Sequence, residues 1–241
     1  MSPLLTDACE YPWRGQQRVK RVVIGGLLFL SYGLIIPGVV LTGYQTVIFR
    51  QVCADDTEAP PGFDDWRQLL VEGLVSWAIL FLYAAAFLVL FGLFAAVIFS
   101  LGGAIGASSG TFAIGGGVVA LVLSLVGFGI VLAILYLIPA AQAAYAVTGD
   151  FSSAFSPSTL RTVAVTKSYL IGVLVAILIY VMTLVSVNVL FITIVGTLLS
   201  PFILFYGYVA GYYAIGAGVA GTSLVTEPPE LEAIDGEPRS E

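Results

Sequence analysis

Three long tracts without a charged residue dominate this sequence. Residues 22–49, 73–149 and 168–226 contain no Asp, Glu, Lys or Arg over 28, 77 and 59 positions. All nine basic and fifteen acidic residues fall outside these tracts. A bilayer core about 30 Å thick is crossed by roughly 20 apolar residues in a helix, and its backbone must be hydrogen-bonded internally. The runs are solidly apolar and do not alternate as barrel strands do. They predict an all-α polytopic membrane protein.

The tracts divide into four long spans, at about 73–101, 118–147, 168–188 and 197–220. The glycine- and serine-rich stretch 102–117 separates the first two, because it disfavours a continuous helix. The segment 188–196 separates the last two, so that Pro201 falls in the first turn of the last helix, where proline is tolerated. We expect one membrane-embedded helical domain over 1–220 and a disordered acidic tail over 221–241.

The first tract, 22–49, allows two interpretations. It is long enough for one span, but Pro37 lies near its middle and would kink or break a helix. The tract is therefore either one kinked span or a re-entrant hairpin that returns to its starting side. Basic residues favour the cytoplasmic side. A single span sets the four basic residues of 1–21 against the other five, whereas a hairpin places all nine on one side.

Interfacial amphipathic helices are predicted beside the spans. In the stretch 60–73, two prolines and a glycine precede Asp64 and Asp65, either of which can cap a following helix. Trp66 is the ring expected at headgroup depth. Weaker versions of this pattern occur at 11–26 and 150–172, and we interpret the three as a faint internal repeat.

The acidic loop 54–65 has two interpretations. Its five carboxylates lie within eleven residues, and hard cations such as calcium bind several carboxylate oxygens. Their spacing is not that of an EF-hand loop, and Pro60 and Pro61 stiffen the centre. The loop is either a solvated acidic surface or a divalent cation site.

Small and polar residues inside the tracts predict helix packing. Gly207 and Gly211 form a GxxxG pair, which brings helices close in lipid, either within the chain or in a homodimer. Gln45, Gln142 and Asn188 are expected to hydrogen-bond between helices.

Composition argues against several classes of function. The chain has no histidine, and no ionisable residue lies inside a predicted span, whereas pumps and proton-coupled carriers place such groups at membrane depth. Cys9 and Cys53 are two distant thiols and do not form a metal or disulfide framework. We predict no catalytic, cofactor or metal-binding residue and no nucleic-acid partner. The acidic, lysine-poor water-facing segments, 50–72 and 227–241, suggest a halophilic source.

Four segments together resemble a known family. They are PGVVLTGY (37–44), FDDWRQLLVEGL (63–74), AFSPSTLRTV (154–163) and LLSPFILFYGYVAGYYAIG (198–216). In order and spacing they resemble the archaeal and bacterial multi-pass membrane proteins catalogued as domain of unknown function 4013. The similarity extends over roughly 12–220. It implies a membrane address and a helical fold, and it carries over no functional residue.

The sequence therefore predicts an integral, multi-pass protein of the cell membrane that is not an enzyme. We expect a non-catalytic scaffold or accessory subunit, with membrane lipid, a second copy or another membrane protein as its partner. The alternative is a passive or substrate-binding permease, in which the broken segments near Pro37 and 102–117 line a cavity.

Overall fold

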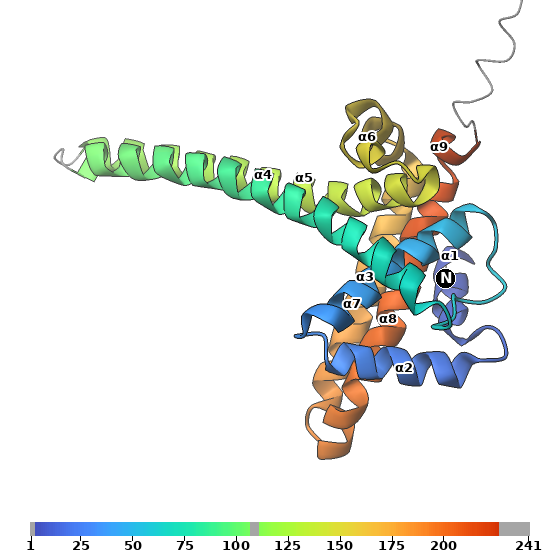
Figure 1. Ribbon diagram of the computed structural model, residues 1–241. Helices are drawn as coiled ribbons and strands as arrows, with labels where there is room; N and C mark the ends of the chain where they lie inside the picture. The colour runs from blue at the N-terminus through green and yellow to red at the C-terminus, as the bar shows by residue number, and fades with distance from the viewer. Residues whose placement is uncertain (1–2, 107–110, 227–241) are drawn as a thin grey trace, which may run out of the picture. The chain divides into compact units, whose positions relative to one another are not determined.

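The computed structural model describes residues 3–106 and 111–226, and every regular element within these ranges is a helix (Figure 1). The elements are α1 (Pro3–Glu10), η1 (Tyr11–Trp13), α2 (Arg18–Leu30), α3 (Ile35–Cys53), α4 (Trp66–Gly106), α5 (Thr111–Thr148), η2 (Phe151–Phe155), α6 (Pro157–Ala164), α7 (Lys167–Leu190), α8 (Ile194–Ala220) and α9 (Ser223–Thr226). The chain divides into two compact units, where the sequence predicted a single domain over 1–220. One unit is Met1–Trp77 with Pro139–Glu241, and the other is Ala78–Ile138.

Four helices are long and apolar enough to cross a membrane. The qualifying segments are Trp66–Val97, Leu121–Thr148, Lys167–Leu190 and Ile194–Ala220. This confirms the predicted all-α fold with four long spans. The chain is therefore a helical membrane protein.

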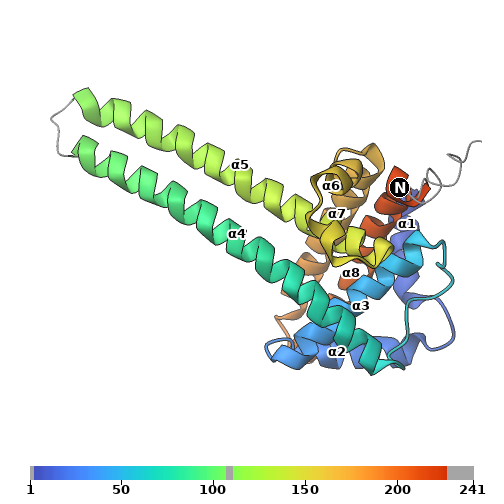
Figure 2. The ribbon, with the colours of Figure 1, turned by 45° about the horizontal axis from the view of Figure 1, so that its top comes forward.

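The unit Ala78–Ile138 is a pair of helices formed by the C-terminal part of α4 and the N-terminal part of α5. The two helices run side by side in both views (Figures 1 and 2), and a Cβ added to Gly127 of α5 would lie 2.6 Å from the ring of Phe94 in α4. Large apolar side chains on the outer faces are exposed, among them Phe81, Leu88 and Phe128.

The prediction that 102–117 interrupts the helix is wrong for most of that stretch. Residues 102–106 continue α4 and 111–117 belong to α5, while 107–110 lie outside the described residues. Glycine costs about 1 kcal/mol relative to alanine in a helix, but an unpaired backbone group in an apolar environment costs several kcal/mol. The free energy gained by pairing the backbone in a helix therefore exceeds the cost of the low helix propensity of glycine.

In the other unit, α8 is the central element. α7 lies along one side of α8, and α1, α2 and α3 also pack against it. The contact with α2 is close, because a Cβ on Gly25 would lie 2.3 Å from the ring of Phe205. Phe205 is also in ring contact with Tyr44 of α3, with centroids 5.7 Å apart. The core of this unit thus forms around α8, whose buried residues run from Gly196 to Val219.

The tract 22–49 is not a single kinked helix. It contains the end of α2, a break at 31–34 and most of α3. Pro37 lies in the first turn of α3, where its missing N–H has no helical partner to lose. The loop that follows α3 folds back to the start of α2, because Arg21 donates to the carbonyl of Pro60, and the hydroxyl of Tyr44 in α3 donates to the carbonyl of Pro61 at 3.0 Å. From this path we expect the tract to return to its starting side.

Three further boundaries differ from the predictions. Pro201 lies two turns inside α8, because α8 already begins at Ile194, and the hydroxyl of Ser200 donates to the carbonyl of Thr197 at 2.7 Å. Proline at 201 cannot supply the helical N–H to that carbonyl, so Ser200 takes its place. In the predicted tail, residues 223–226 form α9, and 227–241 lie outside the described residues.

The helix predicted over 63–73 is no separate interfacial element. It runs without a break into α4. Its predicted cap is confirmed, because the backbone N–H of Gln68 donates to the carboxylate of Asp65 at 2.9 Å. Before α7, in contrast, α6 is a separate short helix that ends at Ala164.

Candidate functional site

Polar side chains gather where α3 meets the first turns of α4 and the last turns of α5. The polar residues of α3 recur every three or four positions and so share one face of the helix. We call the assembly the polar network. It consists of Thr42, Gln45, Thr46 and Arg50 of α3, Glu72, Ser76 and Trp77 of α4, and Gln142, Tyr145 and Ala146 of α5. All of these residues belong to the unit that contains α8.

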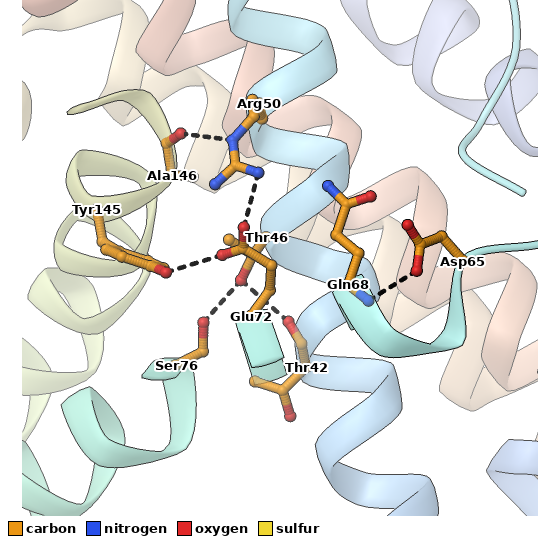
Figure 3. Close-up of polar contacts among 9 residues, drawn as sticks. All are labelled: Thr42, Thr46, Arg50, Asp65, Gln68, Glu72, Ser76, Tyr145 and Ala146. Atoms are coloured by element: carbon orange, nitrogen blue, oxygen red, sulfur yellow. Dashed lines mark hydrogen bonds and ion pairs between the residues drawn. The ribbon is translucent and has the colours of Figure 1, made fainter. Parts of the chain in front are cut away.

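An ion pair forms one end of the polar network (Figure 3). Arg50 donates from Nη1 to Glu72 at 2.8 Å and from Nε to the carbonyl of Ala146 at 3.1 Å. The other carboxylate oxygen of Glu72 accepts the hydroxyl proton of Tyr145 at 2.8 Å. The side chain of Glu72 is only 14% exposed. Water screens such a pair less than a surface pair, which strengthens the interaction. Because the partners come from α3, α4 and α5, these bonds hold the three helices together.

Hydroxyl groups continue the network along α3. The hydroxyls of Thr46 and Ser76 lie 2.7 Å apart, and the indole N–H of Trp77 donates to the hydroxyl of Thr42 at 2.9 Å. Thr42 in turn donates to the carbonyl of Gly38, one turn earlier in α3. These bonds join α3 to α4 at two successive turns.

A pair of glutamines joins α3 to α5. The amide group of Gln45 donates to the side-chain oxygen of Gln142, and both residues are buried. The hydroxyl of Tyr208 in α8 lies 2.8 Å from the carbonyl of Leu41 and 3.2 Å from the side-chain oxygen of Gln45. Its one proton goes to the nearer carbonyl. The predicted interhelical role of Gln45 and Gln142 is confirmed.

Asn188 does not take the role predicted for it. Its side-chain amide donates to the carbonyl of Leu184 in its own helix at 2.8 Å, at an exposed position. An asparagine can bond back to the preceding turn when no partner helix faces it.

A second set of bonds holds the acidic loop 54–65 against the N-terminal segment. Arg21 is 4% exposed and donates to the backbone carbonyls of Pro60 and Arg14. Arg14 donates to the carbonyl of Thr57 at 3.2 Å, and Lys20 pairs with Asp64 at 3.0 Å. Arg14, Lys20 and Arg21, which the sequence analysis counted as signals of membrane orientation, therefore also hold the acidic loop in place.

The loop does not assemble its carboxylates around one point. In the described part of the chain, no group of three or more Asp, Glu, Cys or His side chains could hold a metal ion. Asp64 is instead paired with Lys20. Asp55 adopts a left-handed backbone, with φ of 60°, which aspartate tolerates better than most residues.

The glycines of the GxxxG pair lie against α7 of the same chain. A Cβ on Gly207 would lie 2.1 Å from Thr183, and one on Gly211 would lie 2.4 Å from the ring of Tyr180. Farther along, a Cβ on Gly172 of α7 would lie 2.6 Å from the carbonyl of Ala214. The predicted packing role within the chain accounts for this face of α8.

Several groups outside the four spans have perturbed acidity. Burial raises the pKa of the Cys9 thiol and of the Tyr11 hydroxyl above their usual values. Hydrogen bonds from the hydroxyl and the backbone N–H of Ser152 lower the pKa of Asp150 below 3.8. Cys9 and Cys53 are both free thiols, as predicted.

Sequence reasoning missed the ion pair, although the residues carried a signal. Arg50 directly follows the first uncharged tract and Glu72 directly precedes the second. Opposite charges at facing ends of consecutive apolar tracts can pair when the connecting segment folds back.

A comparison with known protein families shows which family the chain belongs to. Residues 26–199 match the family described as "Protein of unknown function (DUF4013)", which is more than half of the chain. The chain belongs to this family. No curated protein and no solved structure matches it.

The DUF4013 match includes every residue of the polar network, from Thr42 to Ala146. Tyr208 lies beyond its end, and α1 with Arg14 and Arg21 lies before its start. The part of the chain that matches the family therefore contains the helix contacts of α3, α4 and α5.

Proposed function

We propose that this DUF4013 protein is a non-catalytic component of the cell membrane, a scaffold or accessory subunit that packs against another membrane protein. The proposal rests on the apolar length of α4. From residue 73 to 106 this helix carries no charge, and at 1.5 Å per residue that segment is about 50 Å long. The hydrocarbon core is about 30 Å thick.

Tilting does not remove the excess. Even at a tilt of about 40°, the upper end of the usual range, the segment projects about 38 Å along the bilayer normal. Apolar surface outside the core must be covered from water by something other than acyl chains. Large side chains are exposed along this segment, including Leu88, Phe91 and Phe99. A partner protein against α4 supplies that cover.

The polar network supports the same reading. Its ion pair and its glutamine pair are bonded to neighbouring helices of the same chain. Groups used in this way hold helices together, and they are not held ready for a solute. The carboxylate of Glu72 and the guanidinium of Arg50 are structural in this proposal.

Photo-crosslinking in native membranes tests the proposal. A photoreactive residue at Phe99 is expected to give a discrete crosslink to one partner, while the same residue at Leu174 of α7, which is 56% exposed, gives lipid adducts. Lipid adducts alone at both positions would remove the argument from α4.

The permease alternative is decided with purified protein in liposomes. The scaffold proposal expects solute flux no greater than that of empty vesicles. In a permease, the break at 31–34 would line a solute cavity, but here it leads directly into the ordinary start of α3. Flux that saturates with solute concentration would replace the scaffold with a transporter.

The composition supports a proposal about the source. An acidic surface with only two lysines suits a halophilic archaeon, since carboxylates keep a surface hydrated and soluble in concentrated salt. Molar salt is then expected to raise the unfolding temperature, and full stability at low ionic strength would contradict the idea.

A further inference from the structure

Charged residues lie beside the middle of the paired helices α7 and α8. The hydroxyl of Tyr206, near the centre of α8, donates to the carbonyl of Cys9. At the same level, a cavity of about 550 Å³ is lined by Glu10 and Arg14 together with Met182 of α7. The charged N-terminal segment thus meets both helices well inside their length, although both are long and apolar enough to cross a membrane.

These charged groups are open to the surrounding medium. The side chains of Asp7 and Glu10 are 50% and 65% exposed, and those of Lys20 and Asp64 are 54% and 68% exposed. A charged group at the bilayer centre costs about 3 kcal/mol or more, so acyl chains are a poor environment for them. Trp13 lines the same cavity as Glu10 and is 45% exposed, and tryptophan is enriched at the depth of the lipid headgroups. This face therefore requires a polar medium beside the middle of α7 and α8.

The opposite face of α7 is apolar along its whole length. Large exposed apolar side chains occur on it from Leu170 to Val189, a distance of about 28 Å at 1.5 Å per residue. That is close to the whole thickness of the hydrocarbon core, which is about 30 Å. Acyl chains of both leaflets match this face. The two sides of the same helix therefore require bilayers of different thickness.

Helix α2 marks the depth of the interface on the charged face. It runs across α8 rather than along it (Figure 1), and a Cβ on Gly26 would lie 2.1 Å from the ring of Phe202. Its outer face carries large exposed apolar side chains at helical spacing, namely Val19, Val23, Leu27 and Leu30. An amphipathic helix of this kind lies in the plane of the interface, with its apolar face toward the acyl chains. Measured along α8 to its start at Ile194, the hairpin extends about 12 Å beyond Phe202 and about 18 Å beyond Tyr206.

We propose that the bilayer is thinned to roughly half against this charged face, so that water and the headgroups of one leaflet reach the cavity beside Met182. The apolar part of the hairpin beyond the charges, about 12–18 Å long, then matches the thinned core, while the other face of α7 contacts a core of about 30 Å. The partner is the headgroup layer of a phospholipid bilayer, which exposed charges of both signs suit. This contact goes beyond the scaffold role and does not depend on it.

Cysteine accessibility tests the thinning. In a background with Cys9→Ser and Cys53→Ser, the variants are Met182→Cys and two controls, Val181→Cys and Leu184→Cys. The three positions lie within about 5 Å of one another in depth and are 51%, 51% and 53% exposed, but of the three only Met182 lines the cavity. In phosphatidylcholine nanodiscs, Met182→Cys should react with a charged maleimide at least tenfold faster than either control, after normalisation to the rates in dodecyl sulfate.

Two results would overturn the proposal. Equally slow reaction at all three positions would mean that acyl chains or another protein cover the charged face. Equally fast reaction would mean that this part of α7 lies outside the hydrocarbon core on every side. Thermal unfolding of each variant at the wild-type temperature shows that the rates describe the native fold.

A lipid probe separates headgroups from water alone. The wild-type chain is placed in nanodiscs that contain a small fraction of phosphatidylethanolamine with a photoreactive group on its headgroup amine. Adducts mapped by mass spectrometry are expected to be several-fold more frequent at Trp13 and Met182 than at Val181 and Leu184. Fast maleimide reaction at position 182 without these adducts would show a cavity filled by water only, and would overturn the assignment to headgroups.

Discussion

Gly43 of α3 and Gly73 of α4 meet where the two helix backbones touch. A Cβ added to Gly43 would lie 1.9 Å from the carbonyl oxygen of Leu69 and 2.9 Å from the nitrogen of Gly73. A Cβ added to Gly73 would lie 2.0 Å from the carbonyl oxygen of Val39. Small residues let helices approach closely in membranes. This approach brings the hydroxyls of Thr46 and Ser76 within hydrogen-bonding distance.

Alanine at either of these glycines should therefore destabilise the protein. The added carbon meets backbone atoms, which cannot rotate away, so α3 and α4 must move apart. We expect Gly43→Ala or Gly73→Ala to lower the free energy of unfolding by about 1–3 kcal/mol, as for other overpacked sites. Equilibrium unfolding in mixed detergent micelles measures the change.

The matched control for these variants is Gly92→Ala in the same helix α4. A Cβ at Gly92 meets nothing within 4 Å, and alanine is the better helix former by about 1 kcal/mol. Gly92→Ala should be neutral or stabilising. A loss as large as that of Gly73→Ala would show that the effect is not the contact between α3 and α4.

The ion pair of Arg50 and Glu72 should contribute measurably to stability. Glu72→Gln removes the charge that Arg50 contacts at 2.8 Å. We expect a loss of about 1–3 kcal/mol in the free energy of unfolding, typical of hydrogen bonds to charged groups. A double-mutant cycle with Arg50→Gln should give a coupling energy of at least about 0.5 kcal/mol.

The exposed pair of Lys20 and Asp64 is the control for that cycle. Its side chains are 54% and 68% exposed, and exposed pairs contribute about 0.2–1 kcal/mol. Asp64→Asn should cost less than Glu72→Gln. Equal losses would mean that the position of Glu72 between α3, α4 and α5 gives its charge no added strength.

The helices were predictable because lipid leaves the backbone few choices. Uncharged tracts of 28, 77 and 59 residues must be helical, and the turn near Asn188 follows from their length. The cap at Asp65 follows from its place before a helical pattern. The extent of the helices was less predictable, since the propensity of the glycines in 102–117 is weak beside the need to pair the backbone.

The polar network was not predictable from local patterns. Thr42 and Gln45 look like ordinary interruptions of an apolar tract, and only the fold brings Gln142 to Gln45. Gly43 and Gly73 are two of 27 glycines, and their contact depends on how α3 and α4 cross. Contacts between residues far apart in the sequence have no signature in either segment alone.

Asp150 should give the protein an acid-side pH dependence. Its carboxylate accepts bonds from the hydroxyl of Ser152 at 2.6 Å and from the backbone N–H at 3.0 Å, which lowers the pKa of Asp150 below 3.8. A group with a lowered folded-state pKa stabilises the fold above its unfolded pKa, and this contribution is lost as pH falls through the folded pKa. Ser152→Ala should therefore raise the pKa of Asp150 in a carbon NMR titration.

The serine that serves as control for this titration is Ser158. It contacts Ser156 rather than Asp150. Ser158→Ala should leave the titration of Asp150 unchanged. A titration of Asp150 that Ser152→Ala does not move would contradict the assigned cause of the shift.

Ser200 should matter because Pro201 follows it. The hydroxyl of Ser200 donates to the carbonyl of Thr197. Pro201 cannot donate to this carbonyl, because proline has no backbone N–H. Ser200→Ala should lower the free energy of unfolding by about 1 kcal/mol, the usual contribution of a hydrogen bond, because it leaves the carbonyl of Thr197 without this donor. In a Pro201→Ala background the backbone N–H returns to Thr197, so the same change should cost less. Equal costs in both backgrounds would show that the hydroxyl of Ser200 does not compensate for the N–H that Pro201 lacks.

The path of the tract 22–49 predicts the topology. Arg21 contacts Pro60, so residues 16 and 58 should lie on one side of the membrane. Ile192, between α7 and α8 and 83% exposed, should lie on the other. In a background with both Cys9→Ser and Cys53→Ser, single cysteines at Gln16, Glu58 and Ile192 can be labelled with a membrane-impermeant maleimide. Sealed vesicles of one known orientation should label the first two together and protect the third. Opposite labelling of positions 16 and 58 would restore the single span for 22–49. Labelling of Ile192 together with Glu58 would instead show that α7 and α8 enter and leave on one side.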